Sequence, residues 1–116
     1  AAIVAAIDAY RSEGLIPRAA RTGELLRTGL AAFARRRPHI TRVRGLGLLW
    51  AFDLLEPGAD GKVASAARMK NVAEALRAER LHMHKRDNML FLAPPLVTTE
   101  PDLREALERL GRALDR

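Results

Sequence analysis

The spacing of apolar residues changes at Pro38, and this change restricts the possible folds more than any other feature of the sequence. Before Pro38, apolar side chains recur at the spacing of one helix face, at Leu25, Leu26, Leu30 and Phe33. After it, short apolar runs with strand-like spacing extend to Phe52 and are interrupted by Gly45 and Gly47. The sequence therefore predicts a helix that leads into a pair of strands.

The segments on either side continue this mixture of patterns. A first helix is expected to end at Gly14, and Pro17 suits the opening turn of the second. Residues 56–61 form a turn or short loop, because proline and two glycines fall within them. A third helix then follows. Its buried side is predicted to carry Val63, Ala66, Ala67, Val72, Ala73 and Leu76.

The C-terminal third predicts two short strands and a final helix. The strands are expected around residues 81–84 and 89–92, with a polar turn at 85–88 between them. Thr99 and Asp102 resemble a capping box at the start of the helix. One face of that helix is marked by Leu103, Leu107, Leu110 and Leu114. This order of elements predicts an α+β fold, with a small antiparallel sheet covered by helices on one side.

The length of 116 residues fits one domain. Residues 1–37 would form a helical lead-in, and residues 38–116 a sheet with helices. The sequence has no cysteine, which excludes a disulfide or zinc–thiolate framework. No apolar run approaches the roughly 20 residues of a membrane-spanning helix, and no signal-peptide pattern is visible. We therefore expect a cytoplasmic protein without a membrane partner.

The net charge of +6 comes mainly from arginine and is unevenly distributed. Nine arginines and two acids fall between Arg11 and Arg44. Such a stripe can attract nucleic acid through its phosphates. However, residues 35–37 fall where a helix should end, where cations complement the helix dipole, and the chain has few aromatic residues for base stacking. We therefore expect no nucleic-acid partner, and keep a basic nucleic-acid-binding domain as an alternative.

No local motif amounts to an active site. The Gly45–Gly47 pair precedes a strand rather than a helix, which favours a bend over a dinucleotide site. His82 and His84 would share a strand face, but no third metal ligand is evident, so we expect no metal site. Lys85 lies in a polar setting that does not suit an imine-forming lysine. Asp53 and Glu56 flank a turn and show no partner.

Three segments in combination resemble the class III aminotransferases. Residues 44–53 (RGLGLLWAFD) resemble a glycine-rich strand pair of that family, with Arg44, Gly45 and Gly47 as the structural positions. Residues 91–100 (FLAPPLVTTE), with Pro94 and Pro95, resemble the segment before the family's final helix. Residues 5–15 (AAIDAYRSEGL) are similar to the helix after a Gly-Asn-Pro motif. The three follow the family order and span nearly the whole chain.

This resemblance implies that the chain is the C-terminal small domain of a fold-type I enzyme that depends on pyridoxal phosphate. In that family an upstream large domain binds the cofactor and supplies the catalytic lysine, so this chain would hold no catalytic or cofactor-binding residue and be inactive alone. The complete enzyme would be a homodimer that moves an amino group from an amine or amino acid to a keto acid. A free-standing interaction or dimerisation module remains the alternative.

One position departs from the family pattern. Many members place a carboxylate-binding arginine two residues before the Ala-Pro-Pro segment, where this chain has Phe91. Some amine transaminases use an arginine several residues earlier. The resemblance therefore points to Arg86, and less strongly to Lys85 or His84, as the group that binds the substrate carboxylate, while Phe91 makes the pocket more apolar. The competing interpretation is that Arg86 pairs with Asp87.

Overall fold

The computed structural model describes residues 1–58 and 60–116, so Ala59, in the turn predicted at 56–61, lies outside the described residues. The described part contains four helices and one antiparallel sheet of four strands, which confirms the α+β prediction. The helices are α1 (Ala2–Ser12), α2 (Leu15–Arg35), α3 (Ala66–Ala78) and α4 (Glu100–Leu114). The strands are β1 (Ile40–Leu46), β2 (Leu49–Leu54), β3 (His84–Arg86) and β4 (Met89–Leu92).

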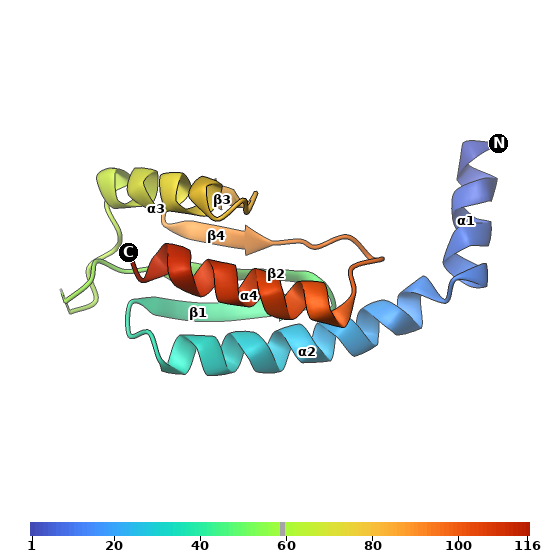
Figure 1. The fold of residues 1–116 in the computed structure, drawn as a ribbon, viewed down its shortest axis with the longest axis horizontal. Helices are drawn as coiled ribbons and strands as arrows, with labels where there is room; N and C mark the ends of the chain where they lie inside the picture. The colour runs from blue at the N-terminus through green and yellow to red at the C-terminus, as the bar shows by residue number, and fades with distance from the viewer. Residues whose placement is uncertain (59) are drawn as a thin grey trace.

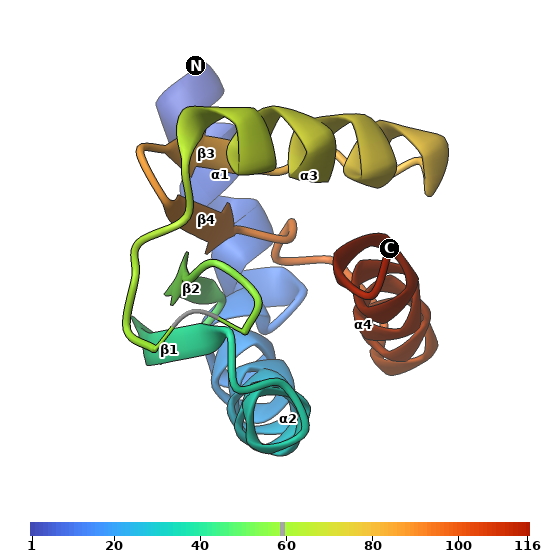
Figure 2. The ribbon, with the colours of Figure 1, turned by 90° about the vertical axis from the view of Figure 1, so that its left-hand side faces the viewer.

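Helices cover one side of the sheet. The strand order is β1-β2-β4-β3, and α2, α3 and α4 all lie on the same side of it (Figures 1 and 2). Helix α1 projects away from this two-layer body, and α2 is the only one of the described helices and strands that it packs against (Figure 1). Among the described residues, no helix has both the length and the apolar character that crossing a membrane requires.

The core forms between the helices and one face of the sheet. Side chains alternate across a strand, so Trp50, Phe52 and Leu54 of β2 point to the same side and are all buried. Leu90 of β4 is directly opposite Phe52 and joins them. The helices complete this core with Leu26, Leu30, Phe33, Met69, Val72, Leu76, Leu110 and Leu114.

The helix starts follow recognisable local signals. Gly14 adopts a left-handed conformation with φ of 58° and separates α1 from α2, as predicted. The Thr99 side chain accepts a hydrogen bond from the Asp102 amide at 3.3 Å, which confirms the predicted cap of α4. Helix α3 begins at Ala66 behind a Ser65 cap. The predicted buried side of α3 is therefore partly wrong: Val63 precedes the helix, and Val63, Ala66 and Ala67 are exposed.

The strand predicted at residues 81–84 lies further along the chain. Strand β3 spans His84–Arg86 and pairs with β4, so Lys85 and Arg86 belong to the strand and not to the predicted turn. The turn is reduced to two residues, and Asp87 takes a positive φ of 52° within it. A two-residue connection with positive φ matches the twist of a tight hairpin. The pairing between β3 and β4 can therefore extend to Arg86 and Met89, directly beside the turn.

Candidate functional site

The side of the sheet that the helices leave bare carries three of the four residues predicted to form the substrate site, namely Arg86, His84 and Phe91. We call this side the open face. In an antiparallel pair, residues that are directly opposite point to the same side. One row across the open face therefore contains Arg44, Ala51, Phe91 and His84, and the next contains Asp53, Met89 and Arg86. The fold thus brings together residues that lie up to 45 positions apart in the chain, as the contact between Arg44 and Met89 shows.

Asp53 is the buried charge of this face. Its exposed fraction is 6%. Arg42 approaches one carboxylate oxygen at 3.2 Å and Arg44 the other at 3.1 Å. The expectation that Asp53 lacks a partner is therefore wrong. The pair was missed because an irregularity in β1, and not the sequence spacing, aims Arg44 at it.

Glu56 also has a partner, but in a structural role. Its carboxylate accepts a hydrogen bond from the Ser65 amide at 2.7 Å, just before α3. Hydrogen bonding to Ser65 lowers the pKa of Glu56. This carboxylate therefore anchors the loop ahead of the helix and does not form a carboxylate pair with Asp53.

The three predicted carboxylate-binding residues do not share one side. Arg86 and His84 lie on the open face, whereas Lys85 is opposite Leu90 and so belongs to the other side, at the sheet edge. None of the ion pairs among residues 1–58 and 60–116 involves Arg86, and its side chain is exposed. The competing interpretation, an Arg86–Asp87 pair, is thus not what the structure shows.

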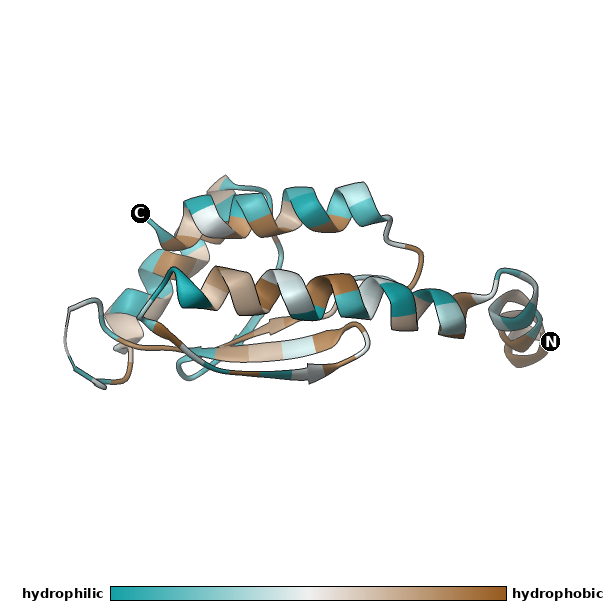
Figure 3. Cartoon of the chain, turned by 90° about the horizontal axis from the view of Figure 1, so that it is seen from below, coloured by the Kyte–Doolittle hydropathy of each residue, from teal (hydrophilic) through white to brown (hydrophobic). Residues whose placement is uncertain are grey.

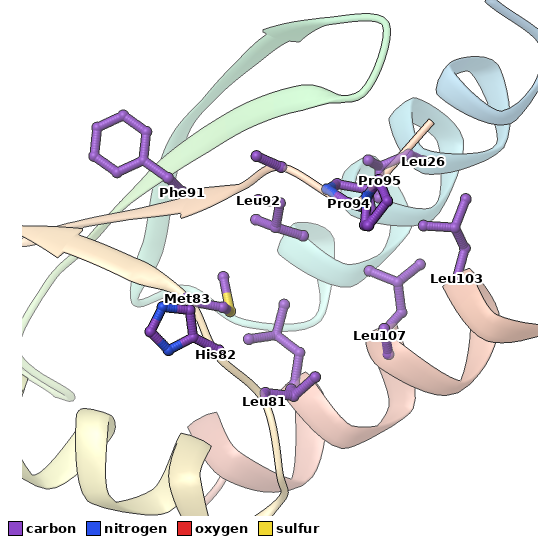
Figure 4. Close-up of a pocket in the computed structure, with 13 residues that line it drawn as sticks. Leu26, Leu81, His82, Met83, Phe91, Leu92, Pro94, Pro95, Leu103 and Leu107 are labelled. Carbon is purple, nitrogen blue, oxygen red and sulfur yellow. The ribbon is translucent and has the colours of Figure 1, made fainter. Parts of the chain in front are cut away.

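Phe91 lies beside His84 on the open face. Their ring centroids are 5.5 Å apart and the ring planes are tilted by 44°. Figure 4 shows the Phe91 ring pointing away from Leu92 and Met83, which lie on the side of the helices. An apolar ring therefore stands next to the predicted cation-bearing strand, where the family pattern has an arginine.

Pro94 and Pro95 line a different feature, an apolar cavity of about 200 Å³ beneath the end of β4 (Figure 4). Leu81 and Met83 close one side of it, and α4 closes another. From α4 the lining residues are Leu103, Ala106, Leu107 and Leu110. His82 is the only titratable residue of the lining. Most of this lining lies on the helix side, and Phe91 is the lining residue that the cavity shares with the open face.

Only one of the two histidines considered as metal ligands belongs to strand β3. His82 precedes β3 and lines the apolar cavity, whereas His84 stands on the open face beside Phe91. Within the part of the chain that the structure describes, no three His, Asp or Glu side chains gather closely enough to hold a metal ion.

The lysines of the chain do not suit a cofactor that is bound as an imine. Such a lysine must lose its proton at neutral pH, which requires burial or a neighbouring cation that lowers its pKa. Lys62, Lys70 and Lys85 are all exposed. None of these three lysines therefore has the surroundings that an imine-forming lysine requires.

One arginine of the cluster at residues 35–37, Arg37, is engaged within the fold. Arg37 makes two hydrogen bonds to the Asp115 carboxylate, at 2.9 and 2.7 Å, and stacks over the Phe33 ring at 3.9 Å. The hydrogen bonds from Arg37 hold the pKa of Asp115 below its ordinary value. Arg37 therefore ties the end of α2 to the end of α4, which supports the structural interpretation of this basic segment.

Comparison with known proteins gives a consistent family. A model described as aminotransferase class-III matches residues 1–114. An ornithine aminotransferase from Emericella nidulans is 34% identical over 114 residues, which cover 98% of this chain and 24% of the relative. A 4-aminobutyrate aminotransferase from Escherichia coli is 30% identical over 119 residues, covering 98% of this chain and 28% of the relative. The chain therefore spans about a quarter of the length of these curated relatives.

Solved structures show the same arrangement. An omega transaminase from Pseudomonas jessenii in complex with PMP superimposes with a TM-score of 0.83 at 27% identity, covering 93% of this chain and 24% of that one. A phospholyase from Arthrobacter in complex with phosphoethanolamine gives a TM-score of 0.88 at 27% identity, covering 97% of this chain and 27% of that one. Enzymes with different reactions thus contain this fold as one quarter of their length.

Proposed function

Because this chain belongs to the class III aminotransferase family, we propose that it is the small domain of a transaminase that depends on pyridoxal phosphate. The reaction would move an amino group from an amine or amino acid to a keto acid. The observation that carries this proposal is the family match across residues 1–114, on a chain whose fold agrees with it. The cofactor would be held by the remainder of the enzyme, because the lysines of this chain are exposed.

The reaction itself is tested with the complete enzyme that contains this chain. We expect the loaded enzyme to convert pyruvate to alanine when an amine donor is supplied, and the chain of 116 residues alone to show no turnover. Release of phosphate from phosphoethanolamine, without alanine formation, would instead assign a lyase reaction, as in the Arthrobacter neighbour. Turnover by the isolated chain would contradict the proposal that the catalytic lysine lies elsewhere.

The partner of this domain would be the large domain of the same enzyme. Helix α1 has no buried residue, and none of the described residues covers its apolar side (Figure 3). Ile3 is 76% exposed and Val4 is 60% exposed, followed along the helix by Ile7 and Tyr10. Exposed apolar patches of this kind mark interaction surfaces. The curated relatives extend far beyond the matched segment, which supports the large domain as the occupant.

A pair of substitutions on α1 tests this contact in the complete enzyme. Ile3→Glu places a charge on the apolar side and should lower the thermal stability of the holoenzyme. Ser12→Glu adds the same charge on the opposite side of the helix and should leave it unchanged. Equal melting temperatures for the two variants would contradict the docking assignment. Sedimentation of the holoenzyme would show whether it is the homodimer that we expect.

For the substrate, we propose that Arg86 binds the carboxylate of the keto-acid acceptor. Its support is the position of Arg86 on the open face, where it is exposed, lies one row from Phe91 and has no acidic partner within residues 1–58 and 60–116. A guanidinium can bind a carboxylate through two parallel hydrogen bonds, which fixes the orientation of the substrate. Phe91 would form the apolar part of the same pocket.

The matched test compares neighbouring residues on opposite sides of β3. Arg86→Ala should raise the KM for pyruvate by about tenfold or more, the size expected for losing a hydrogen bond between charged groups. Lys85→Ala removes the adjacent cation on the other side and should change KM little. His84→Ala tests the third candidate. An unchanged KM in Arg86→Ala would overturn the assignment of Arg86.

A further inference from the structure

Strand β1 contains one extra residue, and this residue decides which side Arg44 occupies. Thr41 is opposite Asp53, but Arg44 is opposite Ala51, so three residues of β1 stand where two residues would stand in a regular ladder. Arg42 adopts a positive φ of 52° at this irregularity. Such a conformation is uncommon for a residue other than glycine and has an energetic cost. The strand therefore has a bulge between Thr41 and Arg44.

The bulge reverses the alternation of side chains beyond it. In a regular strand Thr41 and Val43 would share one side, and Arg44 would point toward the helices. Instead Val43 packs against the core and Arg44 stands on the open face beside Asp53. Bulges are known to re-aim side chains in this way. The strained position of Arg42 is thus coupled to the placement of Arg44.

The two arginines together occupy both oxygens of Asp53. Arg42 Nη1 is 3.2 Å from Oδ2, and Arg44 Nη2 is 3.1 Å from Oδ1. Arg44 Nη2 also lies 3.0 Å from the sulfur of Met89. Its guanidinium therefore covers the residue that separates Asp53 from Arg86 in the register of the sheet.

This arrangement has a consequence for Arg86. Adjacent strands are about 4.8 Å apart, so Asp53 and Arg86 lie two strand spacings from one another on the same side of the sheet. A carboxylate with free oxygens at that separation is within the combined reach of the two side chains and would attract Arg86. Because Arg42 and Arg44 already occupy the Asp53 carboxylate, Arg86 has no acidic partner in the part of the chain that the structure describes.

We propose that Arg44, assisted by Arg42, is a positioning residue that occupies Asp53 and so keeps Arg86 available for the carboxylate of the acceptor substrate. This inference rests on the proposed role of Arg86. Arg44 does not contact the substrate. It acts by preventing an internal ion pair between Asp53 and Arg86 that would compete with substrate binding.

The test uses the complete, cofactor-loaded enzyme and pyruvate as the acceptor. Arg44→Met removes the charge and keeps a long side chain over Met89. It should raise the KM for pyruvate by about two- to fivefold, the size expected of one competing exposed ion pair, while kcat stays near its original value. Adding Asp53→Asn to Arg44→Met removes the competing carboxylate and should restore KM.

A second variant keeps the inference testable if Arg44→Met does not fold. Arg42→Ala frees the other oxygen of Asp53, and the Arg42 side chain is 71% exposed, so the fold should tolerate it. It should also raise KM, by less than Arg44→Met, and Asp53→Asn should again restore it. If KM rises in Arg44→Met or Arg42→Ala but Asp53→Asn does not restore it, the inference is wrong. The same holds if both single variants keep the original KM.

The Arg86→Ala variant tests the role of Arg86 separately. When Arg86→Ala raises KM and the Asp53 variants have no effect, the positioning inference fails and the proposed role of Arg86 stands. When Arg86→Ala leaves KM unchanged, the role of Arg86 fails, and the positioning inference fails with it.

Discussion

The two faces of the sheet are built from the same strands but hold different kinds of residue. On the side of the helices, Trp50, Phe52 and Leu54 are buried among apolar neighbours. On the open face, the alternate residues Ala51 and Asp53 of the same strand lie beside arginines and a histidine. The strand alternation thus separates the apolar core from the face that we propose binds the substrate.

This difference predicts which substitutions should lower the free energy of unfolding and which should alter substrate binding. A core residue on the helix side, such as Phe52, is surrounded by side chains that cannot relax fully into the space it would leave. A residue such as Arg86 on the open face contacts little of its own chain. Substitutions on the two faces should therefore give opposite profiles in stability and activity.

The largest expected effect comes from the helix side. Phe52 has no exposed surface, and Phe52→Ala should lower the free energy of unfolding by about 3–5 kcal/mol, because it removes buried area and leaves a cavity. Arg86→Ala should change it by no more than about 0.5 kcal/mol. Urea unfolding followed by circular dichroism measures both. A similar decrease in the free energy of unfolding for both variants would contradict the proposed difference between the two faces.

The next effect concerns the contact between α2 and the tip of the β1–β2 hairpin. A Cβ atom added at Gly23 would lie 2.6 Å from the backbone oxygen of Gly47. At Gly29, also within α2, the added Cβ would meet only the end of the Leu107 side chain, at 2.7 Å. The first contact is with backbone that cannot move aside, whereas the second is with a side chain that can rotate.

We therefore expect Gly23→Ala to destabilise the chain by about 1–3 kcal/mol, the usual cost of overpacking, although alanine favours helices. Gly29→Ala is the matched control and should be close to neutral. The midpoint of urea unfolding measures both variants. A stabilising Gly23→Ala would show that the hairpin tip is not held against α2. The helix side would then be less tightly packed than we describe.

The sequence predicted the scaffold better than the open face, for a physical reason. Helix spacing and local caps are encoded within a few residues, as at Gly14 and Thr99, and both were placed correctly. The turn expected at residues 85–88 was placed less well, since the extent of β3 depends on its pairing with β4 and not on local composition. The family resemblance, in contrast, rested on three separated motifs and is confirmed.

The Asp53 cluster could not be derived from spacing alone. In a regular strand the Arg44 side chain would point to the helix side, and residues 41–44 contain no sequence pattern that predicts a bulge. The one available signal was indirect. An aspartate between two apolar residues of a strand occupies a buried position, and a buried carboxylate needs a partner.

A smaller effect is expected at the start of α4. Thr99→Ala removes the hydroxyl that accepts a hydrogen bond from Asp102 and should cost about 1 kcal/mol, the usual loss for such a cap. Thr98→Ala is the neighbouring control, since its side chain makes no hydrogen bond among the described residues. Differential scanning calorimetry should show a lower melting temperature for Thr99→Ala alone. Equal values would mean that α4 is held by its packing against α2 and α3 and not by its cap.

The smallest effect is a pH dependence that belongs to the helix side. His39 lies between the end of α2 and the start of β1, and its Nε2 atom is buried without a hydrogen-bond partner among the described residues. Burial, and then the nearby charge of Arg68, lower the pKa of His39 below 6.5, with a further lowering from Arg37 and an opposing influence from Asp115. The folded state therefore binds a proton at His39 less readily than the unfolded state does.

As the pH falls, His39 therefore takes up a proton first in the unfolded state. The free energy of unfolding should decrease below about pH 6.5 for this reason. The decrease should end once the pH is below the pKa of His39 in the folded state. His39→Gln should flatten that part of the stability curve. His84→Gln, on the exposed strand of the open face, is the control and should leave the slope in place. Urea unfolding between pH 7.5 and 5 measures the difference. If His84→Gln flattens the curve and His39→Gln does not, the titrating group lies on the open face, and the assignment of acid sensitivity to the helix side is wrong.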